Sequence, residues 1–245
     1  MPERGWALVT GAARRIGRAL ALAAARAGYD VVVHHHSTDA GVTVQAVEAL
    51  GRRARIAEAD LADPAACRAL AGGGELRLLV NSASLFSDDR IQTLTSEEWD
   101  AAMSANLRAP VLLAQAFAAA LPDGAEGQIV NLIDQRVLKP TPQFFSYAVS
   151  KAALWAATRM LAQALAPRIR VNGIAPGPTL RSIHQSEAAF DAERGAVLLG
   201  HGASPEEIGQ ALVYLIDARS VTGQMIAVDG GQHLAWRTPD IIDPD

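Results

Sequence analysis

Short apolar runs recur along the chain and alternate with longer stretches in which alanine and leucine are mixed with polar residues. Seven runs are rich in valine, leucine or isoleucine, and each is predicted to form a strand: residues 6–10, 30–34, 55–60, 76–81, 128–133, 169–174 and 225–229. These runs are continuously apolar and do not alternate with polar positions. The pattern predicts strands that are buried on both faces of a parallel sheet.

The stretches between the runs carry signals for helix ends. Asp63 and Pro64 supply an N-cap and a first-turn proline, and Gly72 supplies a terminator. Residues 95–98 and 204–207 are capping boxes. Strand and helix therefore alternate, which predicts an α/β fold of the Rossmann type: a doubly wound, parallel, seven-stranded sheet with helices on both faces. In such sheets ligands bind at the carboxyl ends of the strands.

The whole chain, residues 1–245, is predicted to be a single domain because no linker or internal repeat divides it. Residues 177–202 form a long insertion that is irregular or partly helical. An insertion of this length inside a compact domain is typical of a substrate lid.

Composition and charge argue against several classes of function. Hydrophobic residues make up 50% of the chain and charged residues 20%, which is typical of a globular protein. The net charge of −4 argues against a nucleic-acid partner, because phosphate-backbone binding usually needs a basic excess. The single cysteine, Cys67, excludes an intramolecular disulfide and fits a reducing compartment. The longest apolar run falls short of the roughly 18 residues that span a membrane, and no secretory signal precedes the first strand. We therefore expect a cytoplasmic protein with no membrane partner.

The first predicted strand runs directly into a glycine-containing loop that opens a helix, Thr10-Gly11-Ala12-Ala13-Arg14-Arg15-Ile16-Gly17. A tight glycine turn at a helix N-terminus presents free backbone N–H groups, and the helix dipole adds about half a positive charge. The segment is therefore a candidate binding loop for a pyrophosphate. The alternative is a plain strand-to-helix turn that uses glycine for its backbone angles.

Tyr147 and Lys151 stand four residues apart in a predicted helix, so they share one helix face. An ammonium group near a phenol favours the phenolate and lowers a pKa that is normally about 10. The pair predicts an acid–base tyrosine that is usable near neutral pH. The alternative is an accidental surface pair.

Together with further motifs, these segments resemble the short-chain dehydrogenase/reductase family over about residues 5–232. The motifs are, in chain order, Thr10-Gly11 to Gly17, Asp60-Leu61, Asn81 to Ser84, Asn106 in Ala105-Asn106-Leu107-Arg108, Tyr147 with Lys151, Pro176-Gly177, and Val228 to Gly231. The resemblance implies that Tyr147 donates the substrate proton, that Lys151 binds the nicotinamide ribose and tunes the tyrosine, and that Asn106 holds a water of the proton relay.

The resemblance also implies a cofactor site and an oligomeric state. The implied cofactor residues are Thr10, Gly11, Ile16, Gly17, Asp60, Leu61, Asn81, Lys151, Pro176 and Gly177. Members of the family are commonly homotetramers, and alanine-rich faces in residues 101–121 and 152–166 would permit close helix approach. Residues 233–245 run past the family's usual ending, and Trp236 and Arg237 are candidates to reach a neighbouring subunit's site.

One departure from the family pattern concerns the reaction. Most members carry a serine 13 residues before the tyrosine, whereas this chain has Asp134. A carboxyl group that is kept protonated, by burial or by a neighbouring negative charge, can deliver a proton to a nitrogen atom. The reaction therefore need not be carbonyl reduction. The alternative is that Asp134 only caps the following turn.

A second departure is Arg15, which stands where many relatives have the middle glycine of the loop. With Asp134, this pattern resembles pteridine reductases and the related dihydromonapterin and dihydrofolate reductases. Ser84 and Phe86 stand where those enzymes hydrogen-bond the pterin and stack it against nicotinamide. Phe86 could instead be ordinary core, and Ser84 could merely satisfy local backbone.

The end of the second predicted strand bears on the choice of cofactor. An acidic side chain there would bind the ribose of NAD, whereas cationic or hydrogen-bonding groups accept the 2'-phosphate of NADP. The chain supplies Arg15, His36, Ser37 and Thr38, which predict NADP(H); Asp39 is the rival, as a ribose-binding acid. A metal site is not expected, because only His34 and His36 share a strand face and no third ligand has suitable spacing.

These features favour an NADPH-dependent reductase that acts on the C=N bond of a pterin or dihydropterin. In this hypothesis, Tyr147 or Asp134 supplies the proton for the reduction of the C=N bond. The enzymatic alternative is a short-chain carbonyl reductase acting on a ketone or a 3-oxoacyl substrate. A more distant alternative is a non-catalytic NADP-binding sensor.

Overall fold

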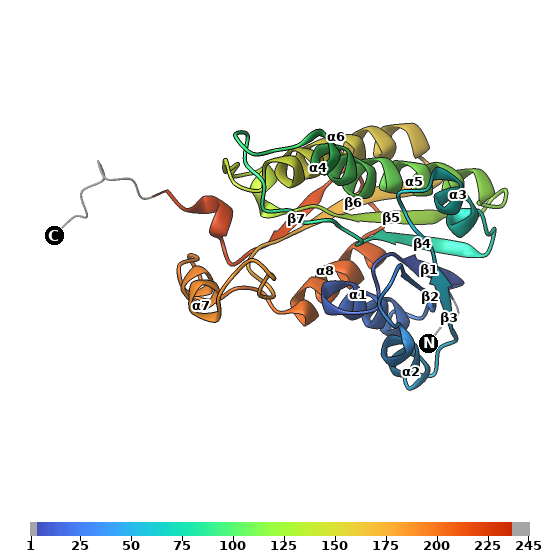
Figure 1. Ribbon diagram of the computed structural model, residues 1–245. Helices are drawn as coiled ribbons and strands as arrows, with labels where there is room; N and C mark the ends of the chain where they lie inside the picture. Colours follow the sequence, from blue (N-terminus) through green and yellow to red (C-terminus); the bar gives the residue numbers. More distant parts are fainter. Residues whose placement is uncertain (1–3, 237–245) are drawn as a thin grey trace.

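The computed structural model describes residues 4–236, which contain one seven-stranded parallel sheet (Figure 1). The strand order is β3-β2-β1-β4-β5-β6-β7. The strands are β1 (Trp6–Val9), β2 (Asp30–His35), β3 (Ala54–Glu58), β4 (Leu76–Asn81), β5 (Gly127–Leu132), β6 (Ile169–Pro176) and β7 (Met225–Val228). All seven predicted strands are present, and the predicted fold class is confirmed.

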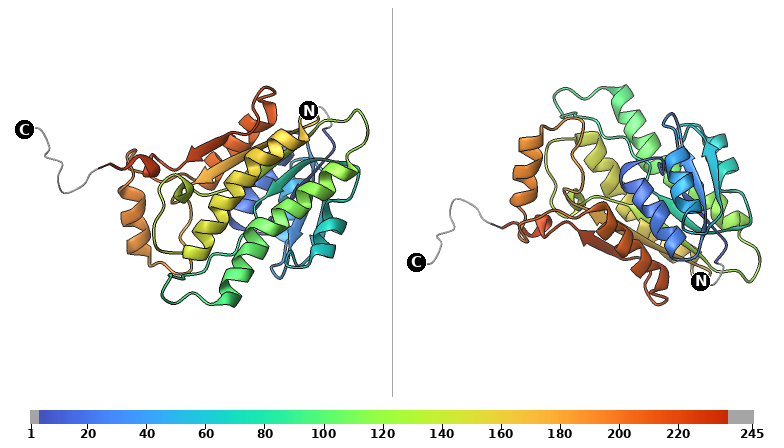
Figure 2. Two further views of the ribbon diagram at one scale, coloured as in Figure 1. Left: turned by 90° about the horizontal axis from the view of Figure 1, so that it is seen from above. Right: turned by 90° about the horizontal axis from the view of Figure 1, so that it is seen from below.

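Helices cover both faces of the sheet. Figure 1 shows α1 (Arg15–Arg26), α2 (Gly41–Glu48) and α8 (Pro205–Asp217) on one face, and α3 (Pro64–Ala71), α4 (Ser96–Met103), α5 (Ala109–Ala120) and α6 (Phe145–Leu165) on the other. The remaining helix, α7 (Glu187–Gly195), stands apart from both layers (Figure 2). Residues 4–236 also contain three short helical turns. The turn η1 (Ser104–Arg108) is π-helical, and η2 (Gln135–Val137) and η3 (Gln232–Leu234) are 3₁₀-helical. Among residues 4–236, no helix combines the length and the apolar character that a bilayer crossing requires.

The helix ends form where the sequence predicts them. The Asp63 side chain accepts a hydrogen bond from the backbone N–H of Ala65 at the start of α3, and Gly72 follows its end. Both capping boxes are formed, at the first turns of α4 and α8.

The core has two halves, one on each side of the sheet. Side chains alternate across a strand, so Ala7 and Val9 of β1 join the cluster under α1 and α8, while Leu8 joins the cluster under α3 and α5. The two edge strands are exceptions: Arg55 and Ile56 of β3 are exposed, and the residues of β7 are only partly buried. The prediction that every strand is buried on both faces was wrong for these two, since β3 pairs only with β2 and β7 only with β6.

The topology leaves a crevice at the carboxyl ends of the central strands. From β1 the chain proceeds outward to β2 and β3, then returns to β4 and proceeds the other way. The loops that follow β1 and β4 therefore diverge, and this switch point is where open α/β sheets bind ligands.

Candidate active site

A cleft of about 660 Å³ opens at this switch point. That volume lies within the range of cofactor and ligand sites. The glycine loop and the segments that follow β2, β3 and β4 line it. Nine of the predicted cofactor residues are in its wall: Gly11, Arg15, Ile16, Gly17, His36, Ser37, Thr38, Asp60 and Leu61.

The glycine loop has the shape that a bound phosphate requires. Gly11 has a φ of +64°, and a Cβ atom there would lie 2.9 Å from the Cα of Ala83. A Cβ atom on Gly17 would lie 2.0 Å from the carbonyl oxygen of Gly11. Because both positions exclude a side chain, backbone N–H groups at the start of α1 can meet a pyrophosphate directly. The residues present therefore fit a dinucleotide.

Five other predicted cofactor residues do not line the cleft: Lys151, which belongs to the catalytic cluster, and Thr10, Asn81, Pro176 and Gly177. The Thr10 hydroxyl accepts hydrogen bonds from the backbone N–H groups of Ser82 and Ala83, at 2.9 and 3.0 Å, and so ties the end of β1 to the end of β4. The Asn81 side chain is buried and donates to Oδ1 of Asn131 at 2.8 Å.

The last two, Pro176 and Gly177, end and follow β6 next to the β7 strand. A Cβ atom on Gly177 would lie 2.6 Å from the Cβ of Asp229, so this glycine allows a close approach of two chain segments. The assignment of these four residues to the cofactor stays a prediction, since none of them lines the cleft.

His34 is a site residue that the sequence analysis did not assign. Its Nδ1 accepts from the backbone N–H of Gly11 at 3.1 Å, and its Nε2 lies 3.1 Å from the carbonyl oxygen of Ala59. A carbonyl oxygen only accepts, so the ring proton is on Nε2. Burial lowers the pKa of His34 to about 4. A neutral imidazole thus holds the glycine loop against the segment that follows β3.

This arrangement predicts a specific pH dependence of stability. The folded-state pKa of about 4 is below the ordinary 6.5, so the unfolded chain binds the proton first as the pH falls. Above about pH 6.5, neutral His34 contributes about 3 kcal/mol to the free energy of unfolding. This contribution is lost as the pH falls towards 4. Urea unfolding should show the advantage of the wild type over His34→Gln shrinking across this window. An advantage that is constant with pH would contradict a neutral His34.

Arg15 connects the cleft to the segment 177–202. Its Nη2 donates to the backbone carbonyls of Leu180 and Arg181, at 3.2 and 2.9 Å. Arg15 also has a φ of 55°, which is uncommon for a residue with a side chain. The guanidinium is therefore directed across the cleft towards the predicted lid.

Tyr147 and Asp134 form the centre of the candidate catalytic cluster. The Tyr147 hydroxyl donates to Oδ2 of Asp134 at 2.8 Å, and the backbone N–H of Arg136 donates to Oδ1 at 2.8 Å. The Arg136 guanidinium lies 3.3 Å from Oδ2. Asp134 does cap the turn η2, as the alternative held, and it also contacts the tyrosine.

The expectation of a lowered tyrosine pKa was wrong. Burial and the neighbouring Asp134 carboxylate raise the pKa of Tyr147 well above its usual value. Lys151 is buried, and its Nζ donates to the carbonyl oxygen of Leu132 at 2.7 Å, while it lies 5.6 Å from the centre of the Tyr147 ring. Burial lowers the pKa of Lys151 to about 8. In this structure the phenol keeps its proton.

The expectation of a protonated Asp134 stays a prediction. The charged neighbour is the cation Arg136 and not a second anion. Both carboxyl oxygens act as acceptors, from a phenol and from a backbone N–H. The Tyr147 hydroxyl is the hydrogen-bond donor of this pair.

Asn106 lies on the π-helical turn η1, an irregularity that often marks functional sites. Its Oδ1 accepts from the Ser84 hydroxyl at 3.0 Å and from the backbone N–H of Leu85 at 2.8 Å. Its Nδ2 donates to the carbonyl oxygen of Leu85 and to the Ser150 hydroxyl. The side chain therefore has no capacity left for the expected relay water. It instead braces the loop after β4 against α6.

Phe86 forms an aromatic wall beside Tyr147. Its ring stacks on Phe144, with centroids 4.3 Å apart, and meets the Tyr147 ring edge-on at 4.7 Å. Phe144 has a left-handed φ of 53°. Such strain costs on the order of 1–3 kcal/mol and clusters at functional sites. The carbonyl oxygen of Phe86 lies 3.3 Å from Nε2 of His184, which belongs to the segment 177–202.

Asp89 is a second residue that the sequence analysis missed. Its buried carboxylate accepts hydrogen bonds from the backbone N–H and the hydroxyl of Ser146, at the first turn of α6. A carboxylate at a helix N-terminus is favourable because of the helix dipole. Asp89 thereby fixes the loop that carries Ser84 and Phe86 to the helix that carries Tyr147.

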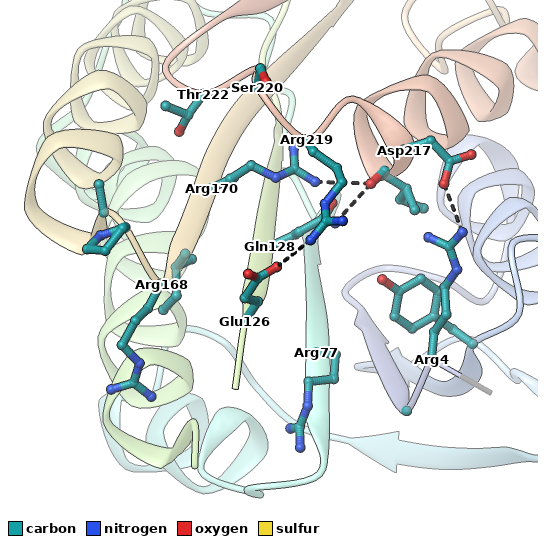
Figure 3. Close-up of a pocket in the computed structure, with 17 residues that line it drawn as sticks. Arg4, Arg77, Glu126, Gln128, Arg168, Arg170, Asp217, Arg219, Ser220 and Thr222 are labelled. Atoms are coloured by element: carbon teal, nitrogen blue, oxygen red, sulfur yellow. Dashed lines mark hydrogen bonds and ion pairs between the residues drawn. The ribbon is translucent and has the colours of Figure 1, made fainter. Parts of the chain in front are cut away.

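A larger cavity, of about 1020 Å³, lies at the opposite, amino ends of the strands (Figure 3). The figure shows several arginines around it. Arg170 donates to the carbonyl oxygens of Leu215, Ile216, Ala218 and Val221, and Arg168 to those of Leu121 and Pro122. These two side chains satisfy carbonyls at the ends of α8 and α5, which is a structural task. The candidate cofactor site is therefore the smaller cleft, whose lining includes Ser84 but not Tyr147, Asp134 or Phe86.

Comparisons with known proteins agree with this geometry. Residues 11–233 match a family model described as enoyl-(acyl carrier protein) reductase. The chain is 33% identical to an uncharacterized oxidoreductase of Mycobacterium tuberculosis, over 98% of this chain and 95% of that protein. It is 33% identical to a 3-oxoacyl-(acyl-carrier-protein) reductase of Aggregatibacter actinomycetemcomitans, over 91% of this chain and 97% of that protein.

Among solved structures, the chain is similar to alternative dihydrofolate reductase 1 of Brucella suis in complex with NADP. The TM-score is 0.93 and the sequence identity is 46%, with 99% of this chain and 100% of that chain covered.

Proposed function

Because the chain belongs to the short-chain dehydrogenase/reductase family, we propose that it is an NADPH-dependent reductase acting on the C=N bond of a dihydropterin. Dihydrofolate contains a dihydropterin ring and belongs to this substrate class. The observation that carries the proposal is the hydrogen bond that the Asp134 carboxylate accepts from the Tyr147 hydroxyl at 2.8 Å. The similarity to a dihydrofolate reductase solved with NADP supports it.

The cofactor of the proposed reaction is NADP(H), bound in the cleft at the switch point. The glycine loop and the first turn of α1 would meet its pyrophosphate. His36, Ser37 and Thr38, which follow β2 in the cleft wall, would hold its 2'-phosphate. Arg15 is also in the wall and would join them by leaving the carbonyls of Leu180 and Arg181. Bound NADPH would supply the hydride.

The hydrogen-bonding capacity of the Asp134 carboxylate favours one substrate class over the other. The oxygen of a ketone would face this carboxylate with no hydrogen to offer, which is unfavourable in a partly buried site. A dihydropterin carries ring N–H and amino groups that can donate to it. The site therefore suits a nitrogen heterocycle better than a simple ketone.

The other side chains of the site have separate roles in the proposed reaction. Tyr147 holds the transferable proton at its hydroxyl, and the Asp134 carboxylate fixes the orientation of that hydroxyl. Lys151 provides a cation behind the tyrosine ring. Phe86 offers an aromatic face for a flat ring, while Asn106 and Ser84 hold the loop that presents it. Positioning of this kind supplies a large share of an enzyme's rate enhancement.

A substrate panel tests the proposal. We expect oxidation of NADPH with dihydrobiopterin, dihydromonapterin or dihydrofolate, with kcat/KM at least about 100-fold above that for simple ketones or 3-oxoacyl thioesters. The same panel with NADH should give much lower values. The 3-oxoacyl reductase relatives favour the carbonyl alternative, and activity with ketones alone would establish it.

Three other expectations remain predictions. The homotetramer is supported by exposed apolar side chains such as Met160 on α6, and the cytoplasmic location rests on the sequence. In the C-terminal tail, Trp236 is exposed. Arg237 and the residues after it lie outside the described part of the chain.

A further inference from the structure

The first turn of α6 carries Tyr147, but the helix has no capping side chain of its own. Its N-cap residue is Phe144, which has a left-handed φ of 53° and a side chain without a polar atom. The first N–H groups of an α-helix have no partner within the helix. In α6 they include the N–H groups of Phe145 and Ser146, the two residues before Tyr147. The order of this turn therefore depends on partners from another segment.

Asp89, in the loop after β4, supplies both of these partners. Its backbone carbonyl oxygen accepts from the N–H of Phe145 at 3.2 Å, and its Oδ1 accepts from the N–H of Ser146 at 3.0 Å. Its Oδ2 accepts from the Ser146 hydroxyl. Asp89 and Ser146 are both buried, so loss of the carboxylate would leave buried donors unsatisfied. Asp89 is therefore an N-terminal cap of α6 that comes from a distant part of the chain.

We propose that Asp89 is a positioning residue of the reductase, which holds the first turn of α6 so that the Tyr147 hydroxyl stays beside Asp134. Tyr147 directly follows Ser146. Its hydroxyl donates to Asp134 at 2.8 Å, and its ring meets Phe86 edge-on at 4.7 Å. Fraying or rotation of the turn would move the hydroxyl relative to both groups. The kinetic consequences rest on the proposed function, whereas the capping concerns only groups of this chain.

The loop after β4 contacts α6 at two other places that do not use Asp89. The Ser84 hydroxyl is linked to α6 through the side chain of Asn106. The Phe86 ring stacks on Phe144, with centroids 4.3 Å apart. These contacts should keep the aromatic wall beside α6 when the Asp89 carboxylate is removed. Asp89 also does not line the cofactor cleft. Its loss should therefore disturb the placement of the proton donor much more than the binding of cofactor or substrate.

The test compares Asp89→Ala, which removes the carboxylate, with Asp89→Asn, whose amide oxygen can still accept from the N–H of Ser146. Asp89→Ser is a third variant, for the case that the alanine variant does not fold. Its hydroxyl oxygen is one bond nearer to the backbone than the carboxylate oxygens, and it leaves a polar group in the buried site. The control is Asp88→Ala, at the exposed neighbouring position of the same loop. Circular dichroism checks that each variant is folded.

The first measurement needs no substrate. Hydrogen exchange, followed by mass spectrometry, compares the backbone N–H groups in the first turn of α6 with those of α8. In Asp89→Ala the N–H groups of the α6 turn should exchange about tenfold faster than in the wild type, which is the usual size of an N-cap effect. The exchange of α8 should not change. Asp89→Asn should restore most of the protection, and Asp88→Ala should match the wild type.

The second measurement is steady-state kinetics with NADPH and dihydrobiopterin, together with a fluorescence titration of NADPH. Asp89→Ala should lower kcat by about 30- to 100-fold, because a small displacement of a positioned group can cost about 10²-fold in rate. The KM for dihydrobiopterin and the Kd for NADPH should stay near their wild-type values, as expected for a group that matters mainly in the transition state. Asp89→Asn should recover most of kcat.

Unchanged exchange at the first turn of α6 in a folded Asp89→Ala or Asp89→Ser protein would overturn the capping role. The positioning role would be overturned by an unchanged kcat, by equal losses in Asp89→Asn and Asp89→Ala, or by a loss that an equally weakened binding of NADPH accompanies. If the wild type reduces ketones and no dihydropterin, the same comparison of kcat with the ketone tests Asp89, and only the proposed substrate is overturned.

Discussion

Tyr147→Phe is expected to lower kcat for dihydropterin reduction by about a thousandfold and to leave the Kd for NADPH nearly unchanged. The loss is that of a positioned proton donor, which typically contributes 10²- to 10⁴-fold. The packing should survive, because phenylalanine keeps the ring that meets Phe86 edge-on at 4.7 Å. Steady-state kinetics and a fluorescence titration of NADPH measure the two quantities.

Tyr214→Phe is the matched control, since Tyr214 lies on α8 and is 57% exposed. It should retain the wild-type kcat. The Tyr147 variant also loses a hydrogen bond to a charged group, worth about 1.5–3 kcal/mol, so circular dichroism must show that it is folded at the assay temperature. If a folded Tyr147→Phe enzyme keeps more than about a tenth of the wild-type kcat, the proton comes from elsewhere.

The sheet could be predicted because its signal is local. Parallel strands buried on both faces must be continuously apolar, and β4 (Leu76–Asn81) was predicted with its observed bounds. The prediction failed for β3, where Ile56 is 50% exposed. An apolar side chain does not reveal whether a second strand will lie beside it, because that depends on the order of strands in the sheet.

The cofactor cleft was predictable for a similar reason. Gly11 and Gly17 are required by the backbone of one short loop, so they can be recognised without knowledge of the rest of the fold. The partners of that loop could not be recognised in this way. His34 meets Gly11 from 23 residues away, and Asp89 meets Ser146 from 57 residues away. A histidine at the end of an apolar strand is the available signal for His34, but the sequence pattern does not indicate the backbone groups that it contacts.

The sequence predicts the pKa shift of Tyr147 with the wrong sign. Helical spacing correctly brings Lys151 near Tyr147, but it does not say which charge contacts the hydroxyl. In the structure that charge is the Asp134 carboxylate, and burial adds to its effect on the tyrosine. A pKa depends on burial and on the direction of each side chain, and both are tertiary properties.

Asp134→Ser is expected to change the substrate class. A serine hydroxyl can donate to a ketone oxygen, whereas the carboxylate can only accept. We expect kcat/KM for the dihydropterin to fall by about 100-fold, and kcat/KM for a simple ketone to rise above the wild-type value. The ratio of the two constants, measured by NADPH oxidation, reports the change independently of the amount of active enzyme.

Asp123→Ser, at an exposed position in the loop before β5, is the control and should leave the ratio unchanged. Asp134→Ser also removes the partner of Arg136, and an unpaired guanidinium beside the substrate would by itself favour a ketone oxygen. The double variant Asp134→Ser with Arg136→Gln separates the two effects, because its ratio should still differ from that of wild type if the hydroxyl matters. If Asp134→Ser keeps the wild-type preference for the dihydropterin, the carboxylate does not select the substrate, and the choice must come from the aromatic wall.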